Sequence, residues 1–307
     1  MPERLFISSF LVEKSWVLYG TAIIGGIAAG ILWTAEGKYM ILNCTPETVG
    51  RNIGIFFAIY NLSSLCGNVF AYYQLYGKSY IDESTRTVII SIMAGLAAVA
   101  TVLFALLRKP PQSSALTNQS EKETRNALSE LKRTWTVFTT REMLLLSITF
   151  AYTGMQQAFN TGIYSPSIGF TLQLGKTSKQ LVPLSGMFIG LGQFTSGLLQ
   201  FLLGKRLSNI IWGRRIMILC TVILQLIAFA LISINIPSQA VFGNTEDEAI
   251  IKSNVYIAIL CSFLLGIGDG GLNTQNFAII ANIFPDDSAQ SFALYKFTKA
   301  SLNKFTA

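Results

Sequence analysis

Seven apolar stretches, each long enough to cross a lipid bilayer as a helix, dominate this sequence. A helix needs about twenty residues to cross ~30 Å of hydrocarbon. The stretches of this length are 15–42, 53–77, 87–107, 142–164, 181–203, 216–236 and 255–284. Open strand edges in lipid would leave backbone groups unpaired, so we expect helices even where β-branched residues cluster, as at 87–90. The sequence therefore predicts an all-α, multi-pass membrane protein.

Two shorter apolar stretches lie outside the seven. Residues 5–12 resemble the tail of a preceding span, and residues 291–307 resemble the first part of a following one. We therefore expect about seven full and two partial transmembrane helices.

Composition excludes several functional classes. Only 13% of the 307 residues are charged, against about 25% in an average soluble domain. Histidine is absent, which excludes imidazole catalysis and His-ligated metals. The four cysteines are widely separated and are interpreted as packing residues: Cys44, Cys66, Cys220 and Cys261. We expect no enzyme activity, no metal and no cofactor.

Basic residues are distributed unevenly between the connections. Connections after the first, third, fifth and seventh stretches carry twelve Lys and Arg, and the opposite set carries six. Because cytoplasmic loops are enriched in positive charge, segment 108–141 is expected in the cytoplasm. This topology accounts for the net charge of +7 without a nucleic-acid partner. It also predicts that the sequons at Asn43, Asn61 and Asn118 are not glycosylated.

Segment 108–141 is the one substantial polar stretch. Ser120 and Glu123 have the spacing of a helix-capping box. Leu128, Leu131, Trp135 and Phe138 then recur at helical spacing, which predicts an amphipathic helix lying against the inner leaflet. A mostly disordered linker is the alternative.

An internal repeat indicates two related halves. GIAAGILWT begins at Gly26 and GIGDGGLNT at Gly266, and downstream FAIY begins at Phe57 and FALY at Phe292. Parallel six-helix halves are typical of major facilitator transporters. The repeat places the first stretch fourth in its half, so we expect a partial N-terminal half at 1–107 with the tail of helix 3 and helices 4–6. The cytoplasmic linker follows at 108–141, and 142–307 is a partial C-terminal half with helices 7–10 and the start of helix 11.

Four segments carry a more specific resemblance: LWTAEGKY from Leu32, GRNIGIF from Gly50, REMLLLSITFAYTG from Arg141 and AILCSFLLGIGDGGLNTQ from Ala258. They resemble the UNC93-like branch of the major facilitator superfamily. The resemblance implies an orphan, transporter-like protein with about twelve spans, so the chain is expected to be a truncated form. At Glu36 the family usually has Gln.

Polar residues within the spans are the candidate site. Asp269, Asn273 and Asn276 share one helix face, because they are spaced by four and three residues. An ionisable group in mid-span marks a functional site by default. The resemblance implies that helices 4, 7 and 10 line a cavity, which adds Glu36 from the first stretch and Gln156, Gln157 and Asn160 from the fourth. Lys296 is the expected charge partner of a carboxylate. The alternative is that these residues only join helices by hydrogen bonds.

Two glycine-containing motifs have different interpretations. The sequence GIGDGG at 266–271 lies inside an apolar stretch, so it is expected to allow close helix packing rather than to bind a dinucleotide. Gly213, Arg214 and Arg215 lie where the superfamily's basic gating motif recurs. The acidic residue of that motif is absent near Ser208, so simple anchoring at the cytoplasmic surface is the alternative.

We therefore expect an orphan solute transporter of the major facilitator type that is transport-incompetent in this truncated form. A membrane scaffold, a trafficking chaperone or a channel-associated regulatory subunit is the alternative. The expected partners are the lipid bilayer and either a small solute or another membrane protein.

Overall fold

The computed structural model describes residues 14–44, 48–76, 82–107, 127–175, 178–208 and 212–306, and most of them are helical. The predicted partial span at 5–12, the capping box at 120–123 and the sequon at Asn118 lie outside these residues. The long helices are α2 (Ser15–Leu42), α3 (Val49–Leu75), α4 (Glu83–Ala105), α8 (Ser178–Ser208), α9 (Gly213–Asn235) and α10 (Val255–Ile283). The remaining helices are α5 (Ala127–Phe138), α6 (Arg141–Ala158), η1 (Phe159–Tyr164), α7 (Ser165–Phe170), η2 (Leu172–Leu174), η3 (Ser238–Val241) and α11 (Ser288–Thr306).

Within this described part, α2, α3, α4, α8, α9 and α10 are long and apolar enough to cross a membrane. They correspond to six of the seven predicted spans, and α2 has the predicted bounds. Only an isolated bridge between Thr171 and Thr245 shows β pairing among the described residues. The prediction of an all-α membrane protein is confirmed.

The fourth predicted span, 142–164, is built differently. It consists of α6, the π-helix η1 and then α7. Pro166 has no amide hydrogen, so the regular α-helical ladder cannot continue through it. Just before it, the Ser165 amide donates to the Asn160 carbonyl, five residues back. The polar residues of this stretch and the π-helix together explain why it is not one long apolar helix.

The chain divides into two compact units, and α11 begins in one and ends in the other. Unit 1 comprises Met1–Asn43, Tyr80–Thr140 and Asp286–Phe297, and unit 2 comprises Cys44–Ser79, Arg141–Pro285 and Thr298–Ala307. These units do not follow the two expected sequence halves, since α3 belongs to unit 2. The division at 107 and 141 therefore stays a prediction.

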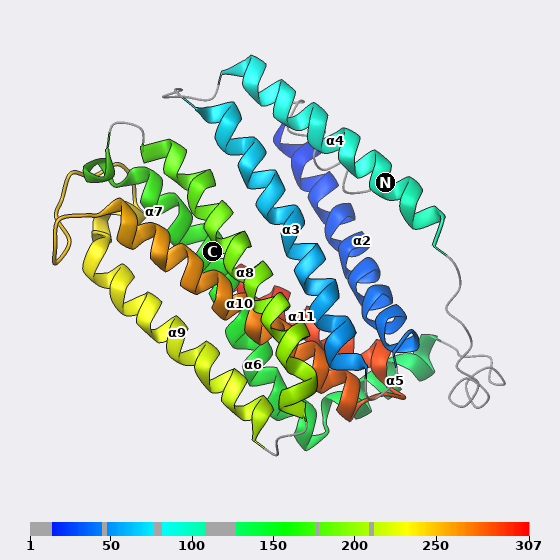
Figure 1. The fold of residues 1–307 in the computed structure, drawn as a ribbon. Coiled ribbons are helices and arrows are strands. Elements are labelled where there is room, and N and C mark those ends of the chain that lie inside the picture. Colours follow the sequence, from blue (N-terminus) through cyan, green and yellow to red (C-terminus); the bar gives the residue numbers. More distant parts are fainter. Residues whose placement is uncertain are drawn as a thin grey trace. The chain divides into compact units, whose positions relative to one another are not determined.

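In unit 2, α8 lies beside α3, and α10 lies beside α8 and α9 (Figure 1). Glycines make this packing close. A Cβ at Gly192 of α8 would lie 2.2 Å from the Phe263 carbonyl oxygen, and one at Gly266 of α10 would lie 2.1 Å from the Ile189 oxygen. A Cβ at Gly268 would meet the Gln225 side chain of α9. The interpretation of GIGDGG as a packing motif is thus supported by its own glycines.

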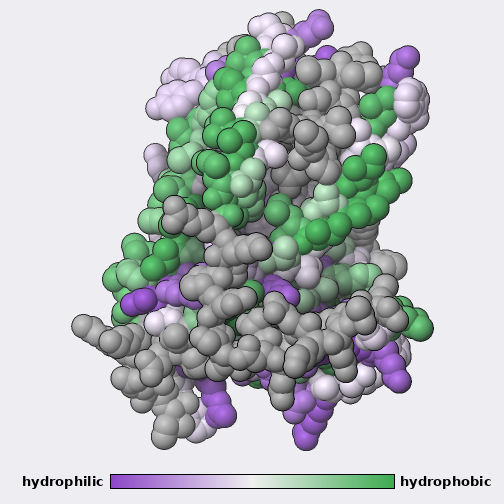
Figure 2. All heavy atoms as spheres, turned by 90° about the vertical axis from the view of Figure 1, so that its right-hand side faces the viewer, coloured by the Kyte–Doolittle hydropathy of each residue, from purple (hydrophilic) through white to green (hydrophobic). Residues whose placement is uncertain are grey.

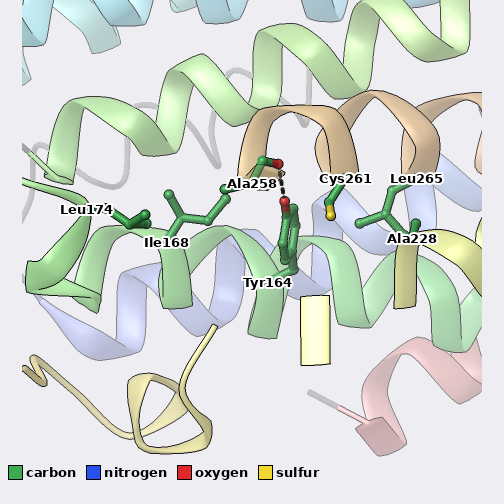
Figure 3. Close-up of a cluster of buried hydrophobic side chains, with 7 residues drawn as sticks. All are labelled: Tyr164, Ile168, Leu174, Ala228, Ala258, Cys261 and Leu265. Carbon is green, nitrogen blue, oxygen red and sulfur yellow. Dashed lines mark hydrogen bonds between the residues drawn. The ribbon is translucent and has the colours of Figure 1, made fainter. Parts of the chain in front are cut away.

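One apolar cluster of unit 2 joins η1, α7 and η2 to α9 and α10 (Figure 3). Its buried members are Tyr164, Ile168, Leu174, Ala228, Ala258, Cys261 and Leu265. The Tyr164 hydroxyl donates to the Ala258 carbonyl oxygen, which satisfies the one polar atom of this side chain in an apolar setting. Of the four cysteines, Cys261 is buried and fits the packing interpretation, whereas Cys66 and Cys220 are exposed on their helices.

Unit 1 contains helices with apolar outer surfaces. Leu96, Val99, Val102 and Leu103 of α4 are all exposed, and Figure 2 shows apolar side chains over much of the described surface on the face that it draws. In water such a surface would be costly, at roughly 25 cal/mol per Å² of apolar area. In hydrocarbon it carries no such cost, as expected for lipid-facing helices.

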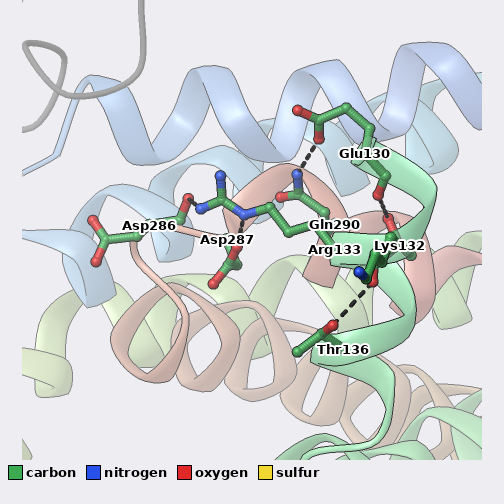
Figure 4. Close-up of polar contacts among 8 residues, drawn as sticks. Glu130, Lys132, Arg133, Thr136, Asp286, Asp287 and Gln290 are labelled. Carbon is green, nitrogen blue, oxygen red and sulfur yellow. Dashed lines mark hydrogen bonds and ion pairs between the residues drawn. The ribbon is translucent and has the colours of Figure 1, made fainter. Parts of the chain in front are cut away.

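The predicted amphipathic helix is present as α5 and is held by polar contacts within unit 1 (Figure 4). Arg133 forms an ion pair with Asp287, and its Nη2 donates to the Asp286 carbonyl oxygen at 3.2 Å. Gln290 Nε2 donates to Glu130 at 2.6 Å. Leu128, Leu131 and Trp135 remain exposed. Contact of this apolar stripe with the inner leaflet stays a prediction.

Replacing Gly192 or Gly266 by Ala should destabilise unit 2, because each new methyl group would overlap a backbone carbonyl that cannot move independently of its helix. Overpacking of this kind typically costs about 1–3 kcal/mol. We expect a lower midpoint of thermal unfolding in detergent for both variants. The control is Gly20→Ala in α2, where an added Cβ meets nothing within 4 Å. This control should unfold at the parent temperature or higher, since Ala favours a helix over Gly. Equal midpoints for all three variants would contradict the packing described above.

Candidate functional site

Asp269 is at the centre of a buried polar network in unit 2. Gln193 Nε2 of α8 donates to its Oδ2 at 2.7 Å, and Asn273 Nδ2, one turn along α10, donates to its Oδ1 at 2.8 Å. Asp269 and Asn273 are buried, with 8% and 7% of their surface exposed. The predicted common face of Asp269 and Asn273 is therefore observed, and it is turned inward.

Lys299 of α11 completes this network. Its Nζ donates to Asn273 Oδ1 at 2.8 Å, so one Asn amide links an ammonium to the Asp269 carboxylate. The Asp269 charge also acts electrostatically on Lys299. Lys296, which the sequence indicated as the charge partner of a carboxylate, lies in unit 1 and acts there on Glu36. Lys299 was not identified from the sequence, although Lys296 and Lys299 lie one helical turn apart and either could have been considered.

Helices α6 and α10 form an antiparallel seam beside this network. Thr149 Oγ1 donates to Asn276 Oδ1 at 3.2 Å, Gln156 Nε2 donates to the Leu265 carbonyl oxygen at 3.5 Å, and the Tyr164 hydroxyl reaches the Ala258 carbonyl oxygen. As residue numbers rise along α6 and η1, those of their partners fall along α10. The register places Asn160 between the contacts of Gln156 and Tyr164.

Three polar atoms of the seam are buried without a hydrogen-bond partner among the described residues. They are Gln156 Oε1, Asn160 Oδ1 and Asn276 Nδ2. Their side chains are at most 5% exposed. Leaving such an atom unsatisfied costs about 1–3 kcal/mol. Gln156 and Asn160 are four residues apart, so they face the same side of the helix. The seam therefore offers both donors and acceptors to a polar guest.

The other predicted residues do not join the seam. Gln157, next to Gln156, is exposed. Glu36 and Lys296 lie in unit 1, where Lys296 stacks on the Trp33 ring and acts electrostatically on the Glu36 carboxylate. Gly213 is buried at the start of α9, and Arg214 and Arg215 are exposed there. The Arg215 guanidinium carbon lies 4.4 Å from the centroid of the Trp212 ring, a cation–π contact within the chain.

Comparison with known proteins assigns this sequence to a family. The family model described as "Ion channel regulatory protein UNC-93" matches residues 4–306. The chain belongs to the UNC-93 family. It is 34% identical to UNC93-like protein MFSD11 of Xenopus laevis over 96% of this chain and 69% of that protein. The Xenopus tropicalis protein of the same name is 35% identical, with the same coverage of both chains.

More distant UNC-93 relatives are also similar over most of the chain. Protein unc-93 homolog A of Mus musculus is 23% identical over 93% of this chain and 66% of its own length. No solved structure was found to match. The UNC93-like resemblance predicted from the four sequence segments is confirmed, and with it a multi-pass membrane protein of the major facilitator type.

Replacing Lys299 by Met should destabilise the protein strongly, because it leaves the Asp269 charge buried without its ammonium partner. Removal of one member of a buried charge pair typically costs about 3–5 kcal/mol. In the double variant Asp269→Asn/Lys299→Met the orphaned charge is gone, so part of this loss should be recovered. The measurement is thermal unfolding of the parent, both single variants and the double variant in the same detergent. Additive losses would show that Asp269 and Lys299 are not coupled.

Proposed function

We propose that this UNC-93 family member is a membrane protein of the major facilitator type that binds a small polar solute at the seam of α6, η1 and α10. The observation that carries the proposal is the set of three buried polar atoms without partners: Gln156 Oε1, Asn160 Oδ1 and Asn276 Nδ2. A solute with hydroxyl, amide or amine groups would supply the missing donors and acceptor. Without a guest, each of these three atoms carries the cost of an unsatisfied buried polar group.

The π-helix supports this assignment. Single π-helical turns are energetically poor and occur frequently at functional sites. Here η1 carries Asn160 at one end and Tyr164 at the other. It thus places an unsatisfied amide one turn before the hydroxyl that fixes the helix to α10.

The Asp269–Asn273–Lys299 network supports a role in moving the solute. A buried carboxylate and ammonium joined through one amide can exchange partners without leaving a bare charge. A solute or proton that reached Asp269 would displace the Asn273 amide and so release Lys299 from its acceptor. We infer that Asp269 couples solute binding to a rearrangement of α10 and α11.

Binding at the seam can be tested by thermal shift, because this measurement detects a bound solute and does not require transport. The purified chain is screened with a defined panel of amino acids, nucleosides and monosaccharides. A ligand at 100 times its Kd stabilises the folded state by about 2.7 kcal/mol. We expect a hit whose stabilisation is lost in Gln156→Leu and kept in Gln157→Leu. The second variant is the matched control, because Gln157 is the exposed neighbour.

If Gln156→Leu and Gln157→Leu respond equally to the hit, the solute does not bind at the seam. Flux of the same hit into proteoliposomes then distinguishes binding from transport. The same flux assay tests whether this 307-residue chain transports the solute by itself, and we expect that it does not. The expectation that the chain is not an enzyme also stays a prediction.

Regulation of another membrane protein is the second candidate function. It is favoured by the description of the matching family as ion channel regulatory, and by the exposed apolar faces of α2 and α4. Under this hypothesis no compound of the panel binds, and the chain co-purifies in a fixed ratio with one membrane protein. Co-purification that is unchanged in Gln156→Leu would assign the function to the outer helix surfaces.

We also propose that segment 108–141 faces the cytoplasm, as its basic residues indicate. Lys132 in α5 and Lys252 before α10 are both exposed and lie on opposite sides in this topology. In intact cells, a membrane-impermeant maleimide should therefore label Lys252→Cys and leave Lys132→Cys unlabelled until the membrane is permeabilised. The reverse pattern would invert the topology.

A further inference from the structure

A second cluster of polar and aromatic side chains lies in unit 1, outside the seam. Trp33, Glu36 and Gly37 are at positions i, i+3 and i+4 of α2, so they share one face. Phe292, Tyr295 and Lys296 have the same spacing in α11. A Cβ at Gly37 would lie 2.5 Å from Phe292 Cγ, so the Phe292 ring packs directly on the glycine backbone. This close approach sets the two faces against each other.

Lys296 occupies an aromatic corner of this cluster. Its Nζ lies 3.9 Å from the centroid of the Trp33 ring and 5.2 Å from that of Tyr295. An ammonium within about 6 Å of a ring centroid is attracted by the negative face of the ring, most strongly for Trp. The Tyr295 side chain is fully buried, so its ring is held in a fixed position beside Lys296.

Glu36 supplies a negative charge to the same corner. Both carboxylate oxygens are buried and accept no hydrogen bond from the described residues. Lys296 is the cation that acts on this carboxylate electrostatically. A carboxylate can accept about four hydrogen bonds. Lys296 therefore balances the charge of Glu36, but the hydrogen-bond acceptors of Glu36 are not used by the described residues.

We propose that Trp33, Glu36 and Tyr295 form a binding site for an organic ammonium ion, and that the Lys296 side chain is its internal occupant. The combination of one aromatic face and one carboxylate fits an alkylated ammonium. It does not fit a hard metal ion, which needs six to eight oxygen ligands for Ca²⁺ or a near-ideal octahedron for Mg²⁺. The described residues contain no cluster of three metal-ligating side chains. A ligand ammonium binds by exchange: it displaces the Lys296 ammonium from the Trp33 ring, and its charge replaces that of Lys296 near Glu36.

Because the ligand must displace Lys296, the proposal predicts how the affinity for an external ammonium depends on Lys296. Lys296 is tethered to the site, and a tethered group competes at an effective concentration on the order of millimolar. An external cation therefore binds weakly to the parent and more tightly once the tethered ammonium is removed. The site goes beyond the proposed solute seam, because its residues lie in unit 1 and binding is measured without any transport.

The test is equilibrium binding of methylammonium chloride, an alkylated ammonium that can donate to Glu36, with sodium chloride at equal ionic strength as the reference. Thermal shift and tryptophan fluorescence of the purified chain are the readouts. We expect Lys296→Met to bind the probe at least tenfold more tightly than the parent. Adding Glu36→Gln or Trp33→Leu to Lys296→Met should abolish this gain, and Lys132→Met in α5 should leave the affinity of the parent unchanged. Parent-like affinity in Lys296→Met, or a gain retained with Glu36→Gln, would overturn the proposal.

Two further variants keep the proposal testable if Lys296→Met does not fold. Lys296→Arg preserves a cation on the Trp33 ring and should bind the probe no more tightly than the parent. Glu36→Gln in the otherwise unchanged chain should weaken the binding of the parent at least tenfold. Unaltered binding in Glu36→Gln would overturn the site even if a solute is later found at the seam, so the two proposals can fail separately.

Discussion

Unit 2 is organised by the need to compensate a charge inside hydrocarbon. Asp269 lies in the middle of α10, the helix with the most buried residues. An ionised carboxylate there costs several kcal/mol unless it is paired and hydrogen-bonded. Gln193 from α8, Asn273 from α10 and Lys299 from α11 meet that need together. These contacts fix which faces of the three helices meet, so one acidic residue specifies much of the packing.

Close backbone approach makes these contacts possible. Helices separated by full side chains would keep an amide such as Gln193 too far from Asp269 for a direct bond. Gly192, adjacent to Gln193, and Gly270, adjacent to Asp269, both pack against the facing helix. Small residues at helix contacts are a general feature of membrane bundles, because lipid offers no hydrophobic driving force for their association. Here the glycines also determine where polar side chains can reach.

The spans were predictable from sequence because length and apolar character are enough to specify a helix in lipid. The bounds of α2 and the near-coincidence of α10 with the predicted 255–284 follow from this. The interruption after Ala158 was not predicted, since apolar length alone does not indicate where an α-helix changes to a π-helix. Choosing between Gln156 and Gln157, or between Lys296 and Lys299, requires the rotation of each helix relative to its neighbours. The sequence does not give this rotation, so it cannot distinguish between two nearby residues of the same type.

The π-helix has a consequence for how this region can vary. A π-helical turn is commonly equivalent to one extra residue accommodated in an α-helix. Each residue of an α-helix turns the chain by about 100°. The π-helical turn absorbs its extra residue without passing this rotation on to the helix that follows, so loss of a single residue between Phe159 and Tyr164 would leave the rotation of α7 relative to α6 unchanged. Ile168 would keep its apolar neighbours, so the effect of such a deletion would fall on the π-helical turn that carries Asn160 and not on the apolar cluster.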